Sequence, residues 1–268
     1  MHATLELARR LDRVEIDFCA LAAMRGESDA ATLERGGGLA VYGAPGSPVN
    51  KVLGLGLGVE VTDEDLDAIE DFYAERTCPV QIELCPLASP DLPSRLTRRG
   101  FVLQAFENQL ARLAPSELVA VQGRADIEVE TGPDEGLWRQ VIAEGFAAPD
   151  RKVADGSLPA NVVAVLGDMM RQFLHPDLVR YLARVDGEPA AGASSAVFRG
   201  VLFVFGTATR PRFRRRGLQR AIVARAINDA RGTADVLMAT TEPGSVSQRN
   251  FERLGFQVMY SRAILIKP

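Results

Sequence analysis

The sequence predicts an α+β protein, with mixed sheets flanked by helices, built from two similar domains in tandem. Three observations support this prediction. Apolar segments of strand length alternate with amphipathic segments of helix length in both halves of the 268 residues. In the second half, an arginine-rich turn joins a strand directly to a helix. A short Arg-x-Gly-Phe segment occurs once in each half, with its glycine at Gly100 and at Gly255.

Length and charge limit the function classes. A chain of 268 residues with 47% apolar residues can build two domains that each bury a core. Residues 1–124 hold 12 basic and 19 acidic residues, and the rest hold 19 and 16, so net positive charge is confined to the second half. The overall net charge of −4 argues against general nucleic-acid binding.

Cysteine and histidine content indicates a reduced, metal-free protein. The three cysteines follow no disulfide spacing, and two histidines cannot complete a zinc site with them. The N-terminal 24 residues are amphipathic and carry acids, unlike a signal peptide. No apolar run approaches the ~20 residues that span a bilayer. We therefore expect a cytoplasmic protein without a metal and without a membrane partner.

The two Arg-x-Gly-Phe segments, one in each half, indicate an internal repeat. Aligning Gly100 with Gly255 sets an offset of 155 residues, which places a predicted helix at 63–76 on one at 218–231. The same offset places a strand at 80–84 on 235–239. The order of elements is therefore the same in both halves, and chance similarity of two helix–strand segments is the alternative.

At the start of helix 63–76, the sequence supplies its own cap. Thr62 is followed by Asp63, Glu64 and Asp65, which is a strong N-cap with acids in the first turn. These carboxylates satisfy the helix end and would repel an anion. Residues 1–118 are thus predicted to form a domain without a phosphate loop.

Residues 114–124 read as a linker, and the second domain is predicted at 125–268. Helices are expected at 137–146 and 158–173, with a polar loop between them. Strands are expected at 178–185, 189–197 and 201–209, the last two joined by a hairpin turn at Arg199-Gly200.

The arginine-rich turn follows strand 201–209 and carries six arginines between Arg210 and Arg220. Positive charge is unfavourable at a helix N-terminus, where the dipole end is positive and four N–H groups lack partners. Arginines placed there predict an anionic ligand such as a diphosphate, held by backbone N–H groups. Gly217 permits the close backbone approach. A solvated surface cluster and a nucleic-acid patch are the alternatives.

Residues Arg214 to Gln219 resemble the acyl-coenzyme A loop of the GNAT acetyltransferase superfamily, R-x-x-G-x-(G/A). Gln219 stands where the family has a small residue. The strand at 236–241 and the helix at 246–254, which ends in Leu-Gly-Phe, are also similar to the family, and the resemblance covers about half the chain, residues 126–268. It implies that domain 125–268 binds acetyl-CoA and that domain 1–118 is a degenerate GNAT-like domain.

The resemblance also implies the residues that hold the acetyl-CoA. The thioester would lie along the strand that precedes the loop, with a backbone N–H as the oxyanion donor, and Asn250 would either bind the pantetheine arm or cap its helix locally. The expected cofactor-binding residues are Thr207, Ala208, Thr209, Arg214, Arg215, Arg216, Gly217, Leu218, Gln219, Arg220, Ser247 and Asn250.

Catalytic groups are harder to place, because Phe251 occupies the position where the family often has a tyrosine general acid. Tyr260, Ser247 or a water could replace it, or the thiolate could leave unassisted. Glu242, at the end of strand 236–241, is the expected general base, with an exposed turn residue as the alternative. By the same resemblance, loop 149–157 would cover the acceptor.

The sequence therefore predicts an N-acetyltransferase that transfers an acetyl group from acetyl-CoA directly to a primary amine of a small molecule or peptide. Phe251 and Gln219 keep a non-catalytic acyl-CoA binding or sensing protein open as the alternative. Only 13 residues follow Gly255, too few for two closing strands. The last strand is thus expected to pair across the domains or between two chains, and a homodimer stays open.

Overall fold

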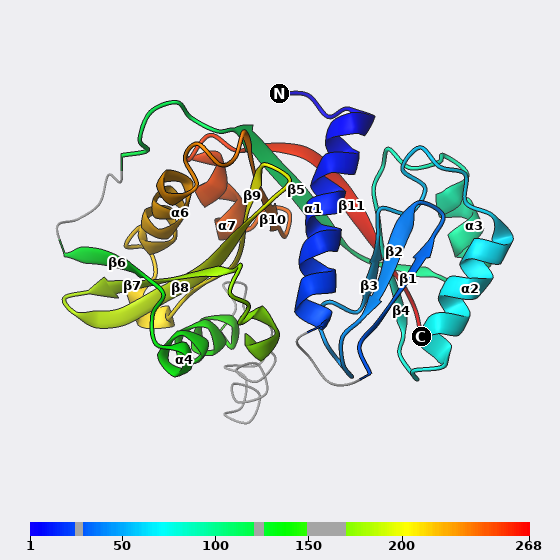
Figure 1. Cartoon of the computed structure of the whole chain (residues 1–268), viewed down its shortest axis with the longest axis horizontal. Coiled ribbons are helices and arrows are strands. Elements are labelled where there is room, and N and C mark those ends of the chain that lie inside the picture. Colours follow the sequence, from blue (N-terminus) through cyan, green and yellow to red (C-terminus); the bar gives the residue numbers. More distant parts are fainter. Residues whose placement is uncertain (25–28, 121–125, 149–169) are drawn as a thin grey trace. The chain divides into compact units, whose positions relative to one another are not determined.

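A computed structural model describes residues 1–24, 29–120, 126–148 and 170–268 (Figure 1). The chain folds into two units. Unit 1 contains Met1–Leu110 and Val258–Pro268, and unit 2 contains Ala111–Gln257. Within the described ranges, no helix is both long enough and apolar enough to cross a membrane.

Unit 1 is a mixed sheet with helices on both faces. The strand order is β1 (Ala31–Arg35), β2 (Gly38–Tyr42), β3 (Lys51–Leu53), β4 (Val80–Leu84), β11 (Gln257–Lys267) and β5 (Val102–Leu113). β3 and β4 are parallel, whereas β1–β2, β2–β3 and β4–β11 are antiparallel. α1 (Leu5–Ala23) lies on one side, and α2 (Asp63–Ala74) and α3 (Leu92–Arg98) lie on the other (Figure 1).

Burial on both faces explains the apolar sequence of β2. Ala40 and Tyr42 of β2 join a buried cluster with Leu66 and Ile69 of α2. Val41, which lies between them in sequence, is also fully buried, because β2 is covered on both faces. Strands buried on both sides read as continuous apolar runs, as this segment does.

Unit 2 has the strand order β10 (Val236–Thr241), β9 (Val201–Thr209), β8 (Glu188–Phe198), β7 (Val179–Val185) and β6 (Ile127–Thr131). β10 and β9 are parallel, and the other neighbours are antiparallel. α4 (Glu135–Phe146) covers one face, and α6 (Leu218–Asp229) with α7 (Val246–Glu252) lies on the other (Figure 1). Short 3-10 helices occupy Met170–Phe173 and Pro211–Phe213.

The predicted α+β class is confirmed, and several element limits agree with the structure. The strands expected at 80–84, 201–209 and 236–241 are present with those bounds. Most of the helix expected at 158–173 lies outside the described residues. The described part of this range, Met170–Phe173, forms a 3-10 helix. The expected acceptor loop at 149–157 also lies outside the described residues.

The units differ from the expected domain limits 1–118 and 125–268, because the last strand joins unit 1. β11 is hydrogen-bonded to β4 in an antiparallel register from Ala263–Leu84 to Lys267–Val80. Arg262 of β11 is fully buried and ion-pairs with carboxylates of unit 1. The last strand was expected to pair either across the domains or between two chains. In the structure it pairs with β4 of the same chain.

Candidate functional site

Helix α2 of unit 1 is closed at its N-terminus by its own side chains. Thr62 Oγ1 accepts from the Asp65 N–H at 3.1 Å, and Asp65 Oδ2 accepts from the Thr62 N–H at 2.9 Å. The hydrogen bond from the Thr62 N–H, with one from the Thr62 hydroxyl, holds the pKa of the Asp65 carboxyl below its usual value. Such a reciprocal capping box satisfies two N–H groups at the helix start, and the acids of the first turn disfavour an external anion there.

Helix α6 of unit 2 begins without any such cap. Its N-cap residue, Gly217, has φ +86° and makes no side-chain hydrogen bond, and the first helical turn contains no acid. A Cβ on Gly217 would meet no atom within 4 Å, so the backbone conformation is what requires glycine. Arg215, two residues earlier, is also left-handed at φ +63°. Alternating backbone conformations of this kind turn N–H groups toward one another and create an anion-binding concavity.

Two arginines of the turn are held by acids of unit 2. Arg210 is buried, with its Nε 2.7 Å from Glu144 Oε2, and also donates to the Pro189 carbonyl at 2.8 Å. Arg212 forms an ion pair with Glu188. Glu144 is thereby engaged by Arg210 and also accepts from Gln140 at 2.8 Å.

Arg214, one of the expected cofactor ligands, instead donates to backbone carbonyls. Its guanidinium bonds to Gly145 at 3.1 Å, to Thr209 at 3.3 Å and to Ala148. Gly145 and Ala148 belong to the C-terminal end of α4, where carbonyls lack helical partners and cations are favourable. The role that the structure gives Arg214 is to hold the end of α4 against the turn.

The three other arginines form no ion pair with an acid in the described part of the chain. Arg215 and Arg216 are exposed, and no ion pair involves either among the described residues. Arg216 lies 5.6 Å from the Phe213 ring centroid, a cation–π contact. Arg220 is half-buried, and its Nε is buried without an acceptor in the described part of the chain. Positive charge is therefore available beside the uncapped start of α6.

A β-bulge interrupts β9 just before the turn. β9 pairs with β8 through Phe205–Ser194 and then through Ala208–Gly192, so one extra residue is present in β9. Gly206, at φ +59°, supplies the left-handed residue of this bulge. The parallel register of β9 with β10 ends at Phe203–Met238, although both strands continue. The β10 side of residues 207–209 is therefore not used by this ladder.

The Gln219 side chain joins the end of β9 to α7. Its Nε2 donates to Thr207 Oγ1 at 3.0 Å and to Ser247 Oγ at 2.8 Å. Asn250 Nδ2 donates to Gln219 Oε1 at 2.7 Å. Four of the expected cofactor-binding residues thus meet in one hydrogen-bonded group. We had not predicted that Gln219 would link them, and its place in a position typical of a small residue was the available signal.

Phe251 and Glu242 lie near this group in the sequence but differ in surroundings. Phe251 is buried against Phe256, with ring centroids 5.1 Å apart, and belongs to the core of unit 2. Glu242 directly follows β10 and is exposed, and its carbonyl accepts from the Ser245 N–H at 3.2 Å. Its exposed position at the end of a strand is compatible with the expected role as a base.

Tyr260, the other expected catalytic residue, belongs to unit 1. It is buried, and its hydroxyl donates to Asp12 Oδ1 at 2.7 Å. Burial and the Asp12 charge raise the pKa of the Tyr260 hydroxyl well above its usual value. The structure therefore groups Tyr260 with the charged residues of unit 1, and not with the arginine turn of unit 2.

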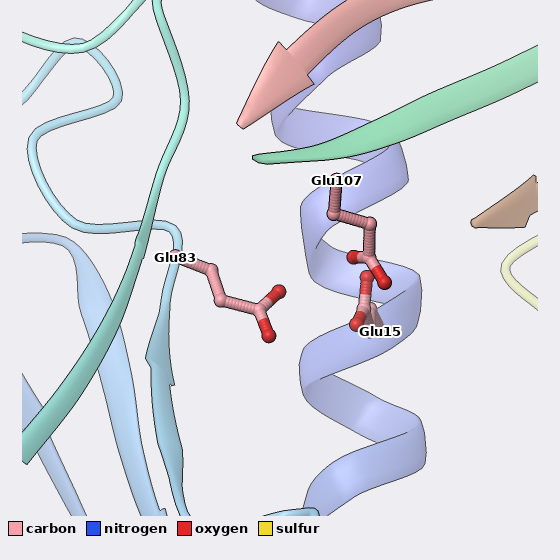
Figure 2. A group of neighbouring side chains, drawn as sticks. All are labelled: Glu15, Glu83 and Glu107. Atoms are coloured by element: carbon pink, nitrogen blue, oxygen red, sulfur yellow. The ribbon is translucent and has the colours of Figure 1, made fainter. Parts of the chain in front are cut away.

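Those charged residues form a buried cluster that we did not predict. Figure 2 shows Glu15, Glu83 and Glu107, whose carboxylate oxygens lie within 4.8 Å of one another. Three carboxylates could bind a cation, but Arg262 Nη2 lies 2.6 Å from Glu15, 2.6 Å from Glu107 and 3.0 Å from Glu83. Lys51 Nζ also lies 2.7 Å from Glu83. The guanidinium takes the position that a metal ion would need. In the sequence, the signal for this cluster is single charged residues within apolar segments, such as Glu83 and Arg262.

Comparison with known proteins finds a family match for part of the chain and similar folds for the whole of it. The model of the Acetyltransferase (GNAT) family matches residues 155–256. A GCN5-related N-acetyltransferase from Kribbella flavida is similar in structure, with a TM-score of 0.71 and 20% identity over 97% of this chain and 95% of that one. Residues 155–256 thus match the GNAT family, and the chain shares the fold of that GCN5-related N-acetyltransferase.

Other solved structures share this fold. A functionally unknown conserved protein from Staphylococcus epidermidis has a TM-score of 0.63 and 13% identity, over 90% of this chain and 95% of that one. A tandem GNAT protein from the clavulanic acid biosynthesis pathway has a TM-score of 0.58 and 13% identity, over 99% and 96%. A search of curated proteins found no match.

Proposed function

We propose that this protein is a GNAT N-acetyltransferase that moves the acetyl group of acetyl-CoA directly to a primary amine of a small molecule or peptide. The observation that carries the proposal is the start of α6, which has neither a capping side chain nor an acid and is flanked by arginines that form no ion pair among the described residues. Bound anions are stabilised at such a position by backbone N–H groups and by the helix dipole.

The residues present fit the diphosphate of the coenzyme. Gly217 leaves open space where a Cβ would project, and Arg220 Nε is buried without an acceptor among the described residues. Arg215 and Arg216 would add charge, whereas Arg214 would act indirectly by holding the end of α4. In unit 1, the self-capped α2 supports the proposal that residues 1–118 do not bind the coenzyme.

The acyl arm would lie along residues 207–209, where the β10 side of β9 is not used by the ladder. A backbone N–H of this segment would donate to the thioester oxygen as it gains charge. Because acyl transfer to an amine depends mainly on positioning, the scaffold can supply roughly 7–11 kcal/mol of the barrier in favourable cases.

Glu242 would take the proton that the attacking amine loses as the C–N bond forms and the C–S bond breaks. General-base help of this kind is typically worth ~10²–10⁴-fold. Tyr260 is a weaker candidate for the acid, since its hydroxyl already donates to Asp12. The hydroxyl of Ser247, in the group around Gln219, is favoured instead.

Calorimetric titration of acetyl-CoA into the wild type, Gly217→Glu and Gly232→Glu tests the proposal. Gly232 is the matched control, because it also has a positive φ and open space at the Cβ position but follows the C-terminal end of α6. We expect binding by the wild type and by Gly232→Glu, and loss of binding in Gly217→Glu.

Absence of wild-type binding would overturn the proposal and return the arginines to the nucleic-acid alternative. Equal loss in both glycine variants would show that the α6 N-terminus is not the site. Where binding is found, a screen of amines follows. Binding without turnover on any amine would support the non-catalytic acyl-CoA binding alternative.

A further inference from the structure

A run of directed hydrogen bonds reaches from Arg253 to the end of β9. It begins where Arg253 Nη1 donates to Asn250 Oδ1 at 3.2 Å. A guanidinium has donors only, so the Asn250 atom that faces it must be the carbonyl oxygen. The Asn250 amide nitrogen is then fixed toward Gln219.

The same logic orients Gln219. Asn250 Nδ2 donates to Gln219 Oε1 at 2.7 Å, so the Gln219 amide nitrogen faces Thr207 and Ser247. An amide nitrogen donates and does not accept. Both hydroxyl oxygens must therefore accept from Gln219, and each hydroxyl proton points away from it. In the described part of the chain, neither hydroxyl donates to a protein acceptor.

We propose that Gln219 is a positioning residue that fixes the Thr207 and Ser247 hydroxyls as hydrogen-bond donors to the pantetheine–thioester arm of the acyl donor. This inference rests on the proposed function. The acceptors that the arm offers to hydroxyl donors are its amide oxygens, the thioester oxygen and the sulfur. Two hydroxyls whose protons are held outward complement such a ligand.

The placement of the two hydroxyls supports this role. Thr207 directly follows the left-handed Gly206 of the β9 bulge, beyond the β9–β10 register. Ser247 lies in the first turn of α7. A small residue in place of Gln219 would leave both hydroxyls free to rotate. Because Phe251 offers no hydroxyl, Ser247 is the donor on α7 that can face the sulfur as the C–S bond breaks.

Two substitutions reverse the direction of the hydroxyls without removing them. In Gln219→Glu, a carboxylate accepts from both hydroxyls and turns their protons inward. In Asn250→Asp, the carboxylate accepts from Arg253 and from the Gln219 amide nitrogen, which turns Gln219 so that its oxygen faces the hydroxyls. The second variant is informative because residue 250 contacts neither hydroxyl in the hydrogen bonds that the structure contains for it.

Gln248→Glu is the matched control. It adds one negative charge to α7, and its Oε1 can still accept from the Gly244 N–H, as in the wild type at 2.7 Å. Like Asn250→Asp, it loses one amide hydrogen bond, here the donation from Nε2 to Glu252 Oε1 at 2.7 Å. Thermal unfolding of each variant checks the fold. Affinities for acetyl-CoA and for 3′,5′-ADP, which lacks the pantetheine arm, are measured by calorimetry.

Gln219→Glu and Asn250→Asp are each expected to weaken acetyl-CoA binding about tenfold or more relative to Gln248→Glu, because donors that match the ligand become acceptors that oppose it. Binding of 3′,5′-ADP should stay within about twofold of that control, since the arm is absent. A loss of both ligands to the same extent would overturn the inference in favour of a general effect of charge or fold.

Wild-type binding with both reversing variants unchanged would overturn the inference and leave the proposed function standing. Absence of wild-type binding would overturn both. If the charged variants do not fold, the Thr207→Val/Ser247→Ala double variant decides. It should weaken acetyl-CoA binding and spare 3′,5′-ADP binding, and equal affinity to the wild type would contradict the role of the hydroxyls.

Discussion

The hydroxyl of Tyr260 donates a hydrogen bond to Asp12 Oδ1 over 2.7 Å and so joins the last strand of the chain to its first helix. Both side chains are buried in unit 1. Burial raises the pKa of the Asp12 carboxyl to about 6, against the opposing effects of the Arg262 charge and the Tyr260 hydrogen bond. At neutral pH this carboxylate is therefore ionised in a site that disfavours its charge.

Asp12→Asn should flatten the dependence of unfolding free energy on pH. Because the folded pKa lies above the unfolded one, stability from protonated Asp12 is complete below about pH 4 and is lost as the pH rises through about 6. The wild type should lose roughly 1–2 kcal/mol from this group between pH 5 and 8, and the variant should not. Urea unfolding at several pH values measures this. Exposed Asp71→Asn is the control, and a variant curve parallel to the wild type would contradict the prediction.

Arg262→Met should destabilise unit 1 strongly. The substitution leaves Glu15, Glu83 and Glu107 without the guanidinium that lies 2.6–3.0 Å from them. Removing one partner from a buried ion network typically costs about 3–5 kcal/mol. The loss should be smaller at pH 5, because burial raises the pKa of the Glu107 carboxyl and favours its protonation. Urea unfolding with exposed Arg231→Met as the control tests this, and a loss independent of pH would argue against the charge mechanism.

Local features of the fold were predictable from the sequence because their causes lie close together in the chain. The cap of α2 depends on Thr62 and Asp65, three residues apart, and the strand at 201–209 is set by its own apolar run. The sequence did not predict that β11 joins the sheet of unit 1. It depends on Arg262, whose partners are 155 or more residues away in α1, β4 and β5.

In the candidate site too, contacts between residues far apart in the sequence were not predictable. The sequence shows six arginines in one turn but not which of them are engaged. Glu144 and Glu188 are 66 and 24 residues from Arg210 and Arg212, so these pairs follow from the packing of α4 and β8 against the turn. The Gln219 contacts likewise join residues 12 and 28 positions away.

The division among the arginines leads to a prediction about affinity. Arg215→Ala/Arg216→Ala should weaken acetyl-CoA binding about tenfold or more, because charge-assisted hydrogen bonds to a diphosphate are lost. Arg212→Ala should stay within about twofold of the wild type, since Arg212 already pairs with Glu188. Calorimetry at two salt concentrations should also show a weaker salt dependence for the double variant. Equal effects of both changes would mean that the turn acts only through its total charge.

Gly145→Ala should disturb the acyl segment from the opposite face of the sheet. A Cβ on Gly145 of α4 would lie 2.7 Å from the Ala208 Cβ and 3.0 Å from the Thr209 nitrogen, so α4 must move away from β9. Overpacking of this kind typically costs about 1–3 kcal/mol, and the shift of residues 208–209 should weaken acetyl-CoA binding as well. Gly136→Ala on the same helix is the control, because its Cβ would meet only Asp134 Oδ1 at 3.4 Å. That change should leave stability equal or raise it by up to ~1 kcal/mol. Urea unfolding and calorimetry of both variants provide the comparison, and a Gly145→Ala protein as stable and as tightly binding as Gly136→Ala would show that α4 does not constrain the acyl segment.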